Sequence, residues 1–166
     1  MGRRFRGESH HKVDSKGRVS IPASFRRVLQ AEDPNCKGDT PELVIVYGGP
    51  SRQFLECYTM RAVEEIDAQI DAMPRGAPER RALEQLFYTQ SIETSVDPSG
   101  RLVLPAKLRQ QIGLDGEAFF ASRGEKFQIW NPETYKQEEL AKTQDWLAEQ
   151  GKDFDPLIFL DGTKGE

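Results

Sequence analysis

The chain has few of the residues that build covalent frameworks and metal sites. Of its 166 residues, two are cysteines and two are histidines. Cys36 and Cys57 cannot form a disulfide framework, and alone they supply too few thiolates for a zinc site. His10 and His11 would point apart on a strand, and no further ligand is suitably spaced to join them. We therefore predict no metal site and no cofactor, and we expect Cys57 to be an inert core residue.

Long apolar runs and common catalytic motifs are also missing. No stretch approaches the ~20 apolar residues that span a bilayer, so we expect no membrane partner. The basic segment Met1–Arg6 is not followed by a hydrophobic signal core, and we do not expect secretion. There is neither a P-loop nor a Gly-x-Ser-x-Gly elbow. His11, Asp14 and Ser15 are close in sequence, but triads are assembled by the fold. We predict a protein that is not an enzyme.

Charge is plentiful but unevenly distributed. The whole chain carries 23 Lys+Arg and 27 Asp+Glu, for a net charge of −4. The first 29 residues alone carry +6, which leaves −10 for the rest. A basic end on an acidic body indicates a surface that binds a polyanion. A solvated basic tail would produce the same pattern.

A fourteen-residue segment occurs twice in the chain. Val13–Arg26 and Val96–Arg109 are identical at seven positions. Downstream, Leu55–Tyr58 resembles Phe127–Trp130, and each is a short alternating segment that ends in an aromatic residue. The first copy has eleven more residues between these matches, and the polar stretch 32–41 that accounts for them is expected to be a surface loop. Two units too small to bury separate cores indicate a pseudo-symmetric pair.

Each copy is predicted to contain two strands joined by a tight turn. Residues alternate between apolar and polar on both sides of the Asp-x-x-Gly-Arg motif. Gly17 and Gly100 fit a position that requires a positive φ, and Asp14 and Asp97 can accept backbone N–H groups across the turn. Proline then begins a short helix in each copy. The side chains expected to face the core from these helices are Phe25, Val28, Leu29, Leu108 and Ile112.

The rest of the chain is predicted to combine core strands and helices. The runs 43–47 and 118–121 are typical of core strands, and helices are expected on both sides of a break at 74–78 and again from Pro132. These patterns predict four regions. They are a first repeat (5–59), a helical connector (60–92), a second repeat (93–131) and a C-terminal helix with an acidic tail (132–166).

The repeated motif and its flanks resemble the MraZ family. The matching residues are Phe5-x-Gly7, Val13-Asp14-x-Lys16-Gly17-Arg18 with Pro22 and Phe25-Arg26, Asp97-x-x-Gly100-Arg101 with Pro105 and Leu108-Arg109, and Phe127-x-Ile129-Trp130. Members of this family are bacterial regulators associated with the division and cell-wall gene cluster, built from tandem SpoVT/AbrB-like repeats. The chain departs from the usual pattern at Pro98 and at 121–123. The resemblance covers about residues 5–130 and weakens in the tail.

The resemblance implies an α+β, mainly β fold. This fold is a swapped-hairpin (AbrB-like) β-barrel formed by two tandem repeats, with flanking helices. It also implies sequence-specific binding of double-stranded DNA at short repeated promoter elements of the protein's own division and cell-wall cluster. A ring-like homo-oligomer in the cytoplasm, associated with the nucleoid, would engage several such elements at once. A different class of function stays open, in which the acidic helices bind a protein partner and the barrel only dimerises.

Charge and turn geometry select the residues expected to contact DNA. Lys16 offers a point charge and Arg18 a planar fork that suits phosphates or guanine. The first six residues are expected to form a mobile arm that reaches the DNA backbone or minor groove. Arg26 and Arg27, at the start of the short helix, could add phosphate contacts. The complete set is Arg3, Arg4, Arg6, Lys12, Lys16, Arg18, Arg26 and Arg27.

The two turns are expected to differ in function. Arg101 is expected to form an ion pair with Asp97 that holds the second turn, because its own copy supplies few basic neighbours. Arg18 is expected to bind DNA, positioned by Asp14. The alternative is an ion pair with Asp14 that only holds the shape of the first turn. On this reasoning the first repeat dominates the affinity.

Overall fold

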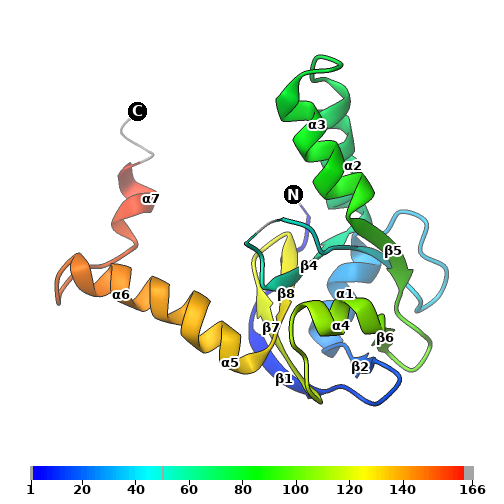
Figure 1. Cartoon of the computed structure of the whole chain (residues 1–166), viewed down its shortest axis with the longest axis horizontal. Helices are drawn as coiled ribbons and strands as arrows, with labels where there is room; N and C mark the ends of the chain where they lie inside the picture. Colours follow the sequence, from blue (N-terminus) through cyan, green and yellow to red (C-terminus); the bar gives the residue numbers. More distant parts are fainter. Residues whose placement is uncertain (1, 50, 163–166) are drawn as a thin grey trace. The chain divides into compact units, whose positions relative to one another are not determined.

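The computed structural model describes residues 2–49 and 51–162 (Figure 1). Its contacts divide the chain into two units, with the boundary between Pro132 and Glu133. The first unit contains both copies of the repeated segment, and the second contains the C-terminal helices. Within the described ranges, no helix is both long and apolar enough to cross a membrane.

Each copy of the repeat contributes four strands to the first unit. Those of the first copy are β1 (Glu8–Lys12), β2 (Arg18–Ser20), β3 (Glu42–Val46) and β4 (Phe54–Thr59). Their equivalents in the second copy are β5 (Ser91–Ser95), β6 (Arg101–Val103), β7 (Glu117–Ser122) and β8 (Lys126–Trp130). The two runs predicted as core strands form β3 and β7, whose side chains are mostly buried.

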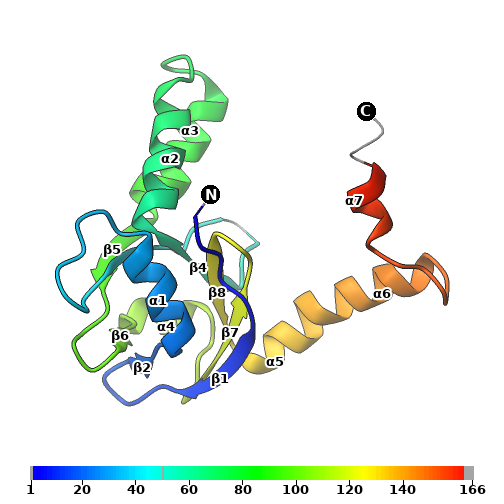
Figure 2. The ribbon, with the colours of Figure 1, turned by 180° about the vertical axis from the view of Figure 1, so that it is seen from behind.

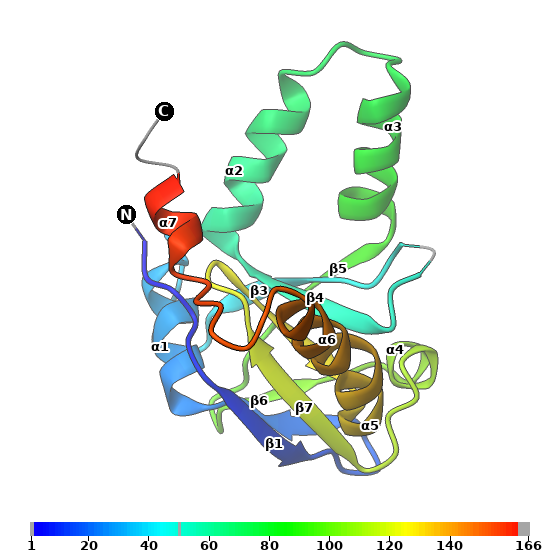
Figure 3. The same cartoon turned by 90° about the vertical axis from the view of Figure 1, so that its left-hand side faces the viewer.

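The first strand of each repeat pairs with the other repeat. β1 pairs with β7 and β5 pairs with β3, giving a six-stranded antiparallel sheet with the order β1-β7-β8-β4-β3-β5. Figure 3 shows β1 running alongside β7. β2 and β6 form a separate two-stranded ribbon. The two strands predicted on either side of the first tight turn are confirmed as β1 and β2, which meet at an antiparallel bridge between Val13 and Val19 and then enter different sheets.

A short helix follows each strand of the ribbon. α1 (Ala23–Ala31) and α4 (Ala106–Gln111) begin directly after Pro22 and Pro105, whose fixed φ suits a helix start. The side chains predicted to face the core from this part of each copy are all buried, namely Phe25, Val28, Leu29, Leu108 and Ile112.

Two helices between the repeats lie side by side and project away from the sheet (Figure 1). α2 (Met60–Asp71) begins after Thr59, whose hydroxyl accepts the N–H of Ala62 at 3.1 Å. α3 (Pro78–Glu84) continues into η1 (Gln85–Thr89), and the predicted break between the two helices is confirmed. The apolar sides of these helices pack on a small cluster of buried residues, namely Val44, Val46, Tyr58 and Ala62.

The main core is built from both repeats and is rich in phenylalanine. The ring of Phe5 lies 5.3 Å from that of Phe25 and 5.0 Å from that of Phe127, both in edge-on geometry. Phe120 stacks on Phe127 with a centroid distance of 5.7 Å. Because each repeat supplies two of these four rings, neither repeat has a complete core of its own.

The N-terminal segment is anchored, which corrects the predicted mobile arm. Phe5 is 2% exposed, and its N–H donates to the carbonyl of Gly124 at 2.6 Å. The N–H of Arg3 donates to Glu32 at 2.8 Å. Figure 2 shows this segment leading directly into β1. The predicted loop at 32–41 is confirmed, and residues 34–40 are largely exposed. Only its first two residues are buried, where Glu32 accepts the N–H of Arg3 and Asp33 accepts the N–H of Glu42 at 2.9 Å.

The second unit is helical. It contains η2 (Tyr135–Leu140), α6 (Ala141–Glu149) and α7 (Ile158–Gly162). α5 (Pro132–Thr134) begins at the boundary between the units, so the predicted start at Pro132 is confirmed. Trp146 lies 6.2 Å from Phe154 and 5.9 Å from Phe159 between ring centroids. The rest of the acidic tail, 163–166, lies outside the described residues. The fold is a mixed α+β one, since helices are at least as extensive as strands, and the expected mainly β character applies to the repeats alone.

Candidate nucleic-acid interface

The β2–β6 ribbon brings the two Asp-x-x-Gly-Arg motifs onto one surface. Val19 pairs with Leu102, and both side chains are buried. Side chains alternate along a strand, so their neighbours point outward, and Val103 is 48% exposed. Arg18 is opposite Val103, and Ser20 is opposite Arg101. Since Val19 and Leu102 are equivalent positions, a pseudo-two-fold axis passes between them and relates Arg18 to Arg101.

The first turn is held in shape by Asp14. Its Oδ1 accepts the N–H groups of Lys16 at 3.0 Å and Arg18 at 2.9 Å, and its Oδ2 accepts Nε of Arg18 at 2.6 Å. These bonds, the backbone N–H of Arg18 above all, lower the pKa of Asp14. Gly17 has the predicted positive φ, at +84°. The guanidinium of Arg18 is thereby fixed through Nε, and its two terminal nitrogens take no part in this contact.

The second turn repeats this geometry more loosely. Oδ1 of Asp97 accepts the N–H of Arg101 at 2.9 Å, and Gly100 has a φ of +78°. The distance from Nε of Arg101 to Oδ2 of Asp97 is 3.7 Å, so the ion pair predicted here is present but is longer than its counterpart.

Each turn also receives an arginine from the other repeat. Arg109 donates through Nε to the carbonyl of Leu104 at 2.9 Å, and the N–H of Leu104 donates to the carbonyl of Gly17 at 2.8 Å. A methyl group on Gly17 would lie 2.9 Å from Nε of Arg109. In the same way, a methyl group on Gly100 would collide with the guanidinium of Arg26.

This exchange supplies the basic neighbour that the second turn lacks within its own repeat. The second turn does have a basic neighbour close by, Arg26, but that residue comes from the first repeat. Strand exchange therefore gives each turn two guanidinium groups, and the linear sequence around Arg101 did not indicate this.

The other predicted residues do not all gather at the ribbon. Lys12 and Arg27 are exposed on β1 and α1, as is Arg6 in the N-terminal segment. Nη1 of Arg4 lies 3.9 Å from Glu125, in the segment that follows β7. By contrast, the N–H of Val13, next to the first turn, donates to Gly116, just before β7. The arm and the turn thus lie at opposite ends of β7, and the basic segment does not form a single surface.

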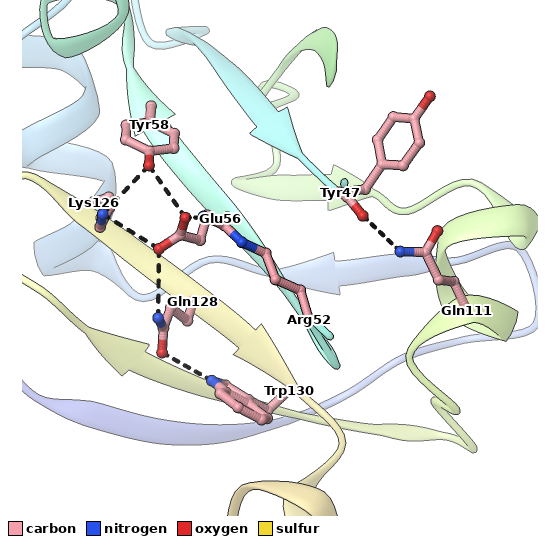
Figure 4. A network of polar contacts seen from close by, with 8 residues as sticks. All are labelled: Tyr47, Arg52, Glu56, Tyr58, Gln111, Lys126, Gln128 and Trp130. Atoms are coloured by element: carbon pink, nitrogen blue, oxygen red, sulfur yellow. Dashed lines mark hydrogen bonds and ion pairs between the residues drawn. The ribbon is translucent and has the colours of Figure 1, made fainter. Parts of the chain in front are cut away.

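A buried polar network across β4 and β8 had no sequence signal (Figure 4). The side chain of Glu56 is 5% exposed, and its carboxylate contacts Arg52 at 2.5 Å and Lys126 at 3.3 Å. Tyr58 and Gln128 donate to the same carboxylate at 3.2 and 3.5 Å. Burial alone would raise the pKa of Glu56, but Lys126 and Arg52 outweigh it and lower this pKa. Because β4 and β8 belong to different repeats, the network joins the two.

The histidines and cysteines take structural positions. The ring centroid of His10 lies 4.9 Å from that of Phe119, and His11 lies 5.1 Å from Phe120. Burial, followed by the charge of His10, lowers the pKa of His11. Cys57 is fully buried, as predicted, and burial raises its pKa. In the part of the chain that the structure describes, no group of three or more His, Cys, Asp or Glu side chains could hold a metal ion.

Two interlocked repeats around an arginine-bearing ribbon define a tandem-repeat α+β protein with basic turns. The sequence model of the family described as "MraZ protein, putative antitoxin-like" matches residues 4–86 and 87–150. The chain therefore belongs to the MraZ family.

Relatives named transcriptional regulator MraZ cover most or all of the chain. The protein from Ruegeria pomeroyi is 66% identical over 166 residues, which is 99% of each chain. One from Cereibacter sphaeroides is 43% identical over 95% of this chain and 97% of its own length. One from Nitrosomonas europaea is 36% identical over 127 residues, covering 76% of this chain and 80% of its own length. All three are named as transcriptional regulators, which agrees with the prediction that this chain is not an enzyme.

Proposed function

We propose that this protein is a sequence-specific DNA-binding regulator of transcription that acts on short repeated promoter elements of its own division and cell-wall cluster. The observation that carries the proposal is the outward face of the β2–β6 ribbon, where Arg18 and Arg101 lie on either side of a pseudo-two-fold axis. In this proposal the two repeats, 5–59 and 93–131, close as a swapped-hairpin barrel that holds the ribbon at its surface. In the chain, the connector (60–92) joins the two repeats and the C-terminal region (132–166) follows the second.

A two-stranded ribbon has the dimensions to enter the major groove, which is about 12 Å wide. Arg18 is the residue best prepared to read a base there. Asp14 holds Nε of Arg18 at 2.6 Å, so the guanidinium is oriented before DNA arrives and less conformational entropy is lost on binding. Its two terminal nitrogens match the O6 and N7 atoms of guanine, a contact that contributes about 1–3 kcal/mol of discrimination.

The basic residues around the ribbon would bind the phosphate backbone. Lys16 is in the first turn, Lys12 is on the strand that leads into it, and Arg27 is on α1 next to Arg26; all three are exposed. Phosphate contacts of this kind add affinity and fix the register but carry little sequence information. The arginines of the anchored N-terminal segment lie at the other end of β7 and would make a separate backbone contact.

Self-association would bring several ribbons to neighbouring promoter elements. The second unit exposes a run of apolar side chains, with Leu157 63% and Leu160 62% exposed. Exposed apolar patches of this kind mark interaction sites. We propose that they support a ring-like homo-oligomer, in which each bound element raises the effective concentration of the next. Such a complex would reside on the nucleoid in the cytoplasm.

The test is a salt titration of binding to the DNA upstream of the encoding gene. The logarithm of the affinity falls with log salt by about 0.9 per neutralised phosphate, so we expect a slope of several units. Scrambled DNA of the same length is the control, and we expect it to bind more weakly. A flat salt response, or no retardation of the upstream DNA, would overturn the proposal. Such a result would favour a protein partner for the acidic helices.

A further inference from the structure

The arginines of the two turns occupy equivalent positions but differ in their hydrogen bonds. At the first turn, Nε of Arg18 donates to Asp14 at 2.6 Å and Nε of Arg109 donates to Leu104 at 2.9 Å. At the second turn, the corresponding Nε atoms of Arg101 and Arg26 are buried and have no hydrogen-bond acceptor among the described residues. The nearest carboxylate oxygen is 3.7 Å from Nε of Arg101, which is too long for a hydrogen bond.

Two unsatisfied charged donors at one turn are unusual in a folded protein. Buried polar groups are almost always hydrogen-bonded, and leaving one without an acceptor is costly, more so for a charged group. The first turn is an internal reference, because the same residue types in the same fold are satisfied there. The missing hydrogen bonds are therefore a property of the second turn and not of the Asp-x-x-Gly-Arg motif in general.

The local geometry concentrates positive charge at this turn. The guanidinium of Arg26 lies directly against Gly100, where any side chain would collide with it. The next residue in the chain is Arg101, whose side chain is 38% exposed on the outer face of the ribbon. Two guanidinium groups from different repeats thus lie beside one glycine, and the carboxylate of Asp97 lies at ion-pair distance from Arg101.

We propose that the second turn, Asp97–Arg101, together with Arg26, is a binding site for a phosphate oxyanion. This assignment rests on the proposed function, in which the phosphate is one of the DNA backbone. Arg101 can turn toward a phosphate at little cost, since its contact with Asp97 is long and both side chains are more than a third exposed. Arg18 would have to break a 2.6 Å bond to do the same. The first turn therefore presents a fixed guanidinium group to a base, and the second turn binds a phosphate of the backbone.

The first test compares salt slopes for the full chain on upstream DNA. Arg26→Gln and Arg101→Gln should each lower the slope by about 0.9. Between 50 and 200 mM salt, the affinity of each variant should then fall about 3.5-fold less than that of the unaltered protein. Arg109→Gln is the matched control, because Arg109 is the equivalent of Arg26 but already donates to Leu104. Its slope should stay unchanged.

The second test uses inorganic phosphate without DNA. At constant ionic strength, replacing chloride by phosphate should raise the Tm of the unaltered protein and of Arg109→Gln more than that of Arg26→Gln or Arg101→Gln. Circular dichroism of all variants confirms that they are folded.

The two tests separate the site from the proposed function. If phosphate stabilises through Arg26 and Arg101 but the protein does not retard upstream DNA, the oxyanion site stands and its ligand is a free phosphate group. If the protein binds DNA while Arg26→Gln and Arg101→Gln match Arg109→Gln in slope and in phosphate response, the oxyanion site is overturned and DNA binding stands.

Discussion

Replacing Glu56 by glutamine should weaken the buried polar network that joins the two repeats. The substitution keeps the shape of the side chain but leaves Arg52 and Lys126 without their shared carboxylate. Removing one partner of a buried ion pair costs about 3–5 kcal/mol. The two cations are 27% and 29% exposed, so water recovers part of this loss, and we expect about 2–3 kcal/mol. This corresponds to a fall in Tm of roughly 5–12 °C for a unit of this size.

The same substitution should remove a component of the pH dependence. Burial raises the pKa of Glu56, but Lys126 and Arg52 outweigh it and hold this pKa below its ordinary value of 4.5, so the stabilising effect of the carboxylate is fully present above pH 4.5. The effect is lost as the pH falls through the pKa of the folded state. The stability difference between the two proteins should therefore be constant from pH 7 to about pH 5 and should shrink on further acidification.

Urea unfolding at a series of pH values measures both effects. Glu125→Gln is the matched control, since Glu125 is 51% exposed and lies 3.9 Å from Arg4. An exposed pair of this kind contributes about 0–1 kcal/mol. If Glu56→Gln were as stable as the unaltered protein at pH 7, the network would not join the repeats as described.

Two further predictions concern single residues. Gly17→Ala should destabilise the protein by more than the roughly 1–2 kcal/mol that a positive φ costs alanine, because the added methyl group meets the carbonyl of Leu104. Gly76→Ala is the control, because Gly76 has a φ of +80° and no atom within 4 Å of an added methyl group, so this variant measures the cost of φ alone. If Gly17→Ala and Gly76→Ala lost the same unfolding free energy, the predicted clash at Gly17 would be refuted. Cys57 should react with a thiol reagent only as the protein unfolds, whereas the partly exposed Cys36 should react in the native state. Labelling of both at the same rate in the folded protein would contradict the burial of Cys57.

Local sequence patterns predicted the elements well, because each depends on nearby residues. The Asp-x-x-Gly-Arg turn requires an Asp side chain that reaches the backbone two to four residues on and a glycine at positive φ, and both lie within five positions. The start of α1 after Pro22 and the buried side of that helix follow from equally local rules.

The arrangement of the site was much less predictable, because it depends on pairing between distant strands. Arg26 is 75 residues from Arg101 in the sequence. It reaches the second turn only because β2, which leads into α1, pairs with β6. Phe5 anchors the N-terminal segment through contacts with Gly124 and Phe127, more than a hundred residues away. The count of basic residues therefore predicted a single basic surface, whereas the fold places these residues on two separate surfaces.

The burial of Glu56 was missed for a similar reason. In an alternating strand, a glutamate normally indicates a solvated face. Here its cross-strand neighbour Gln128, together with Lys126, comes from the other repeat, and their hydrogen bonds make a buried charge tolerable.

The most direct test of the central claim is the affinity of Arg18→Gln and Arg101→Gln for upstream and scrambled DNA, measured by fluorescence anisotropy at one fixed salt concentration. Arg18→Gln should lose about 5- to 150-fold of the discrimination between the two DNAs, the equivalent of about 1–3 kcal/mol. Arg101→Gln should weaken binding to both DNAs by a similar factor and keep the discrimination. If both variants bind both DNAs as tightly as the unaltered protein does, the ribbon is not the surface that contacts DNA.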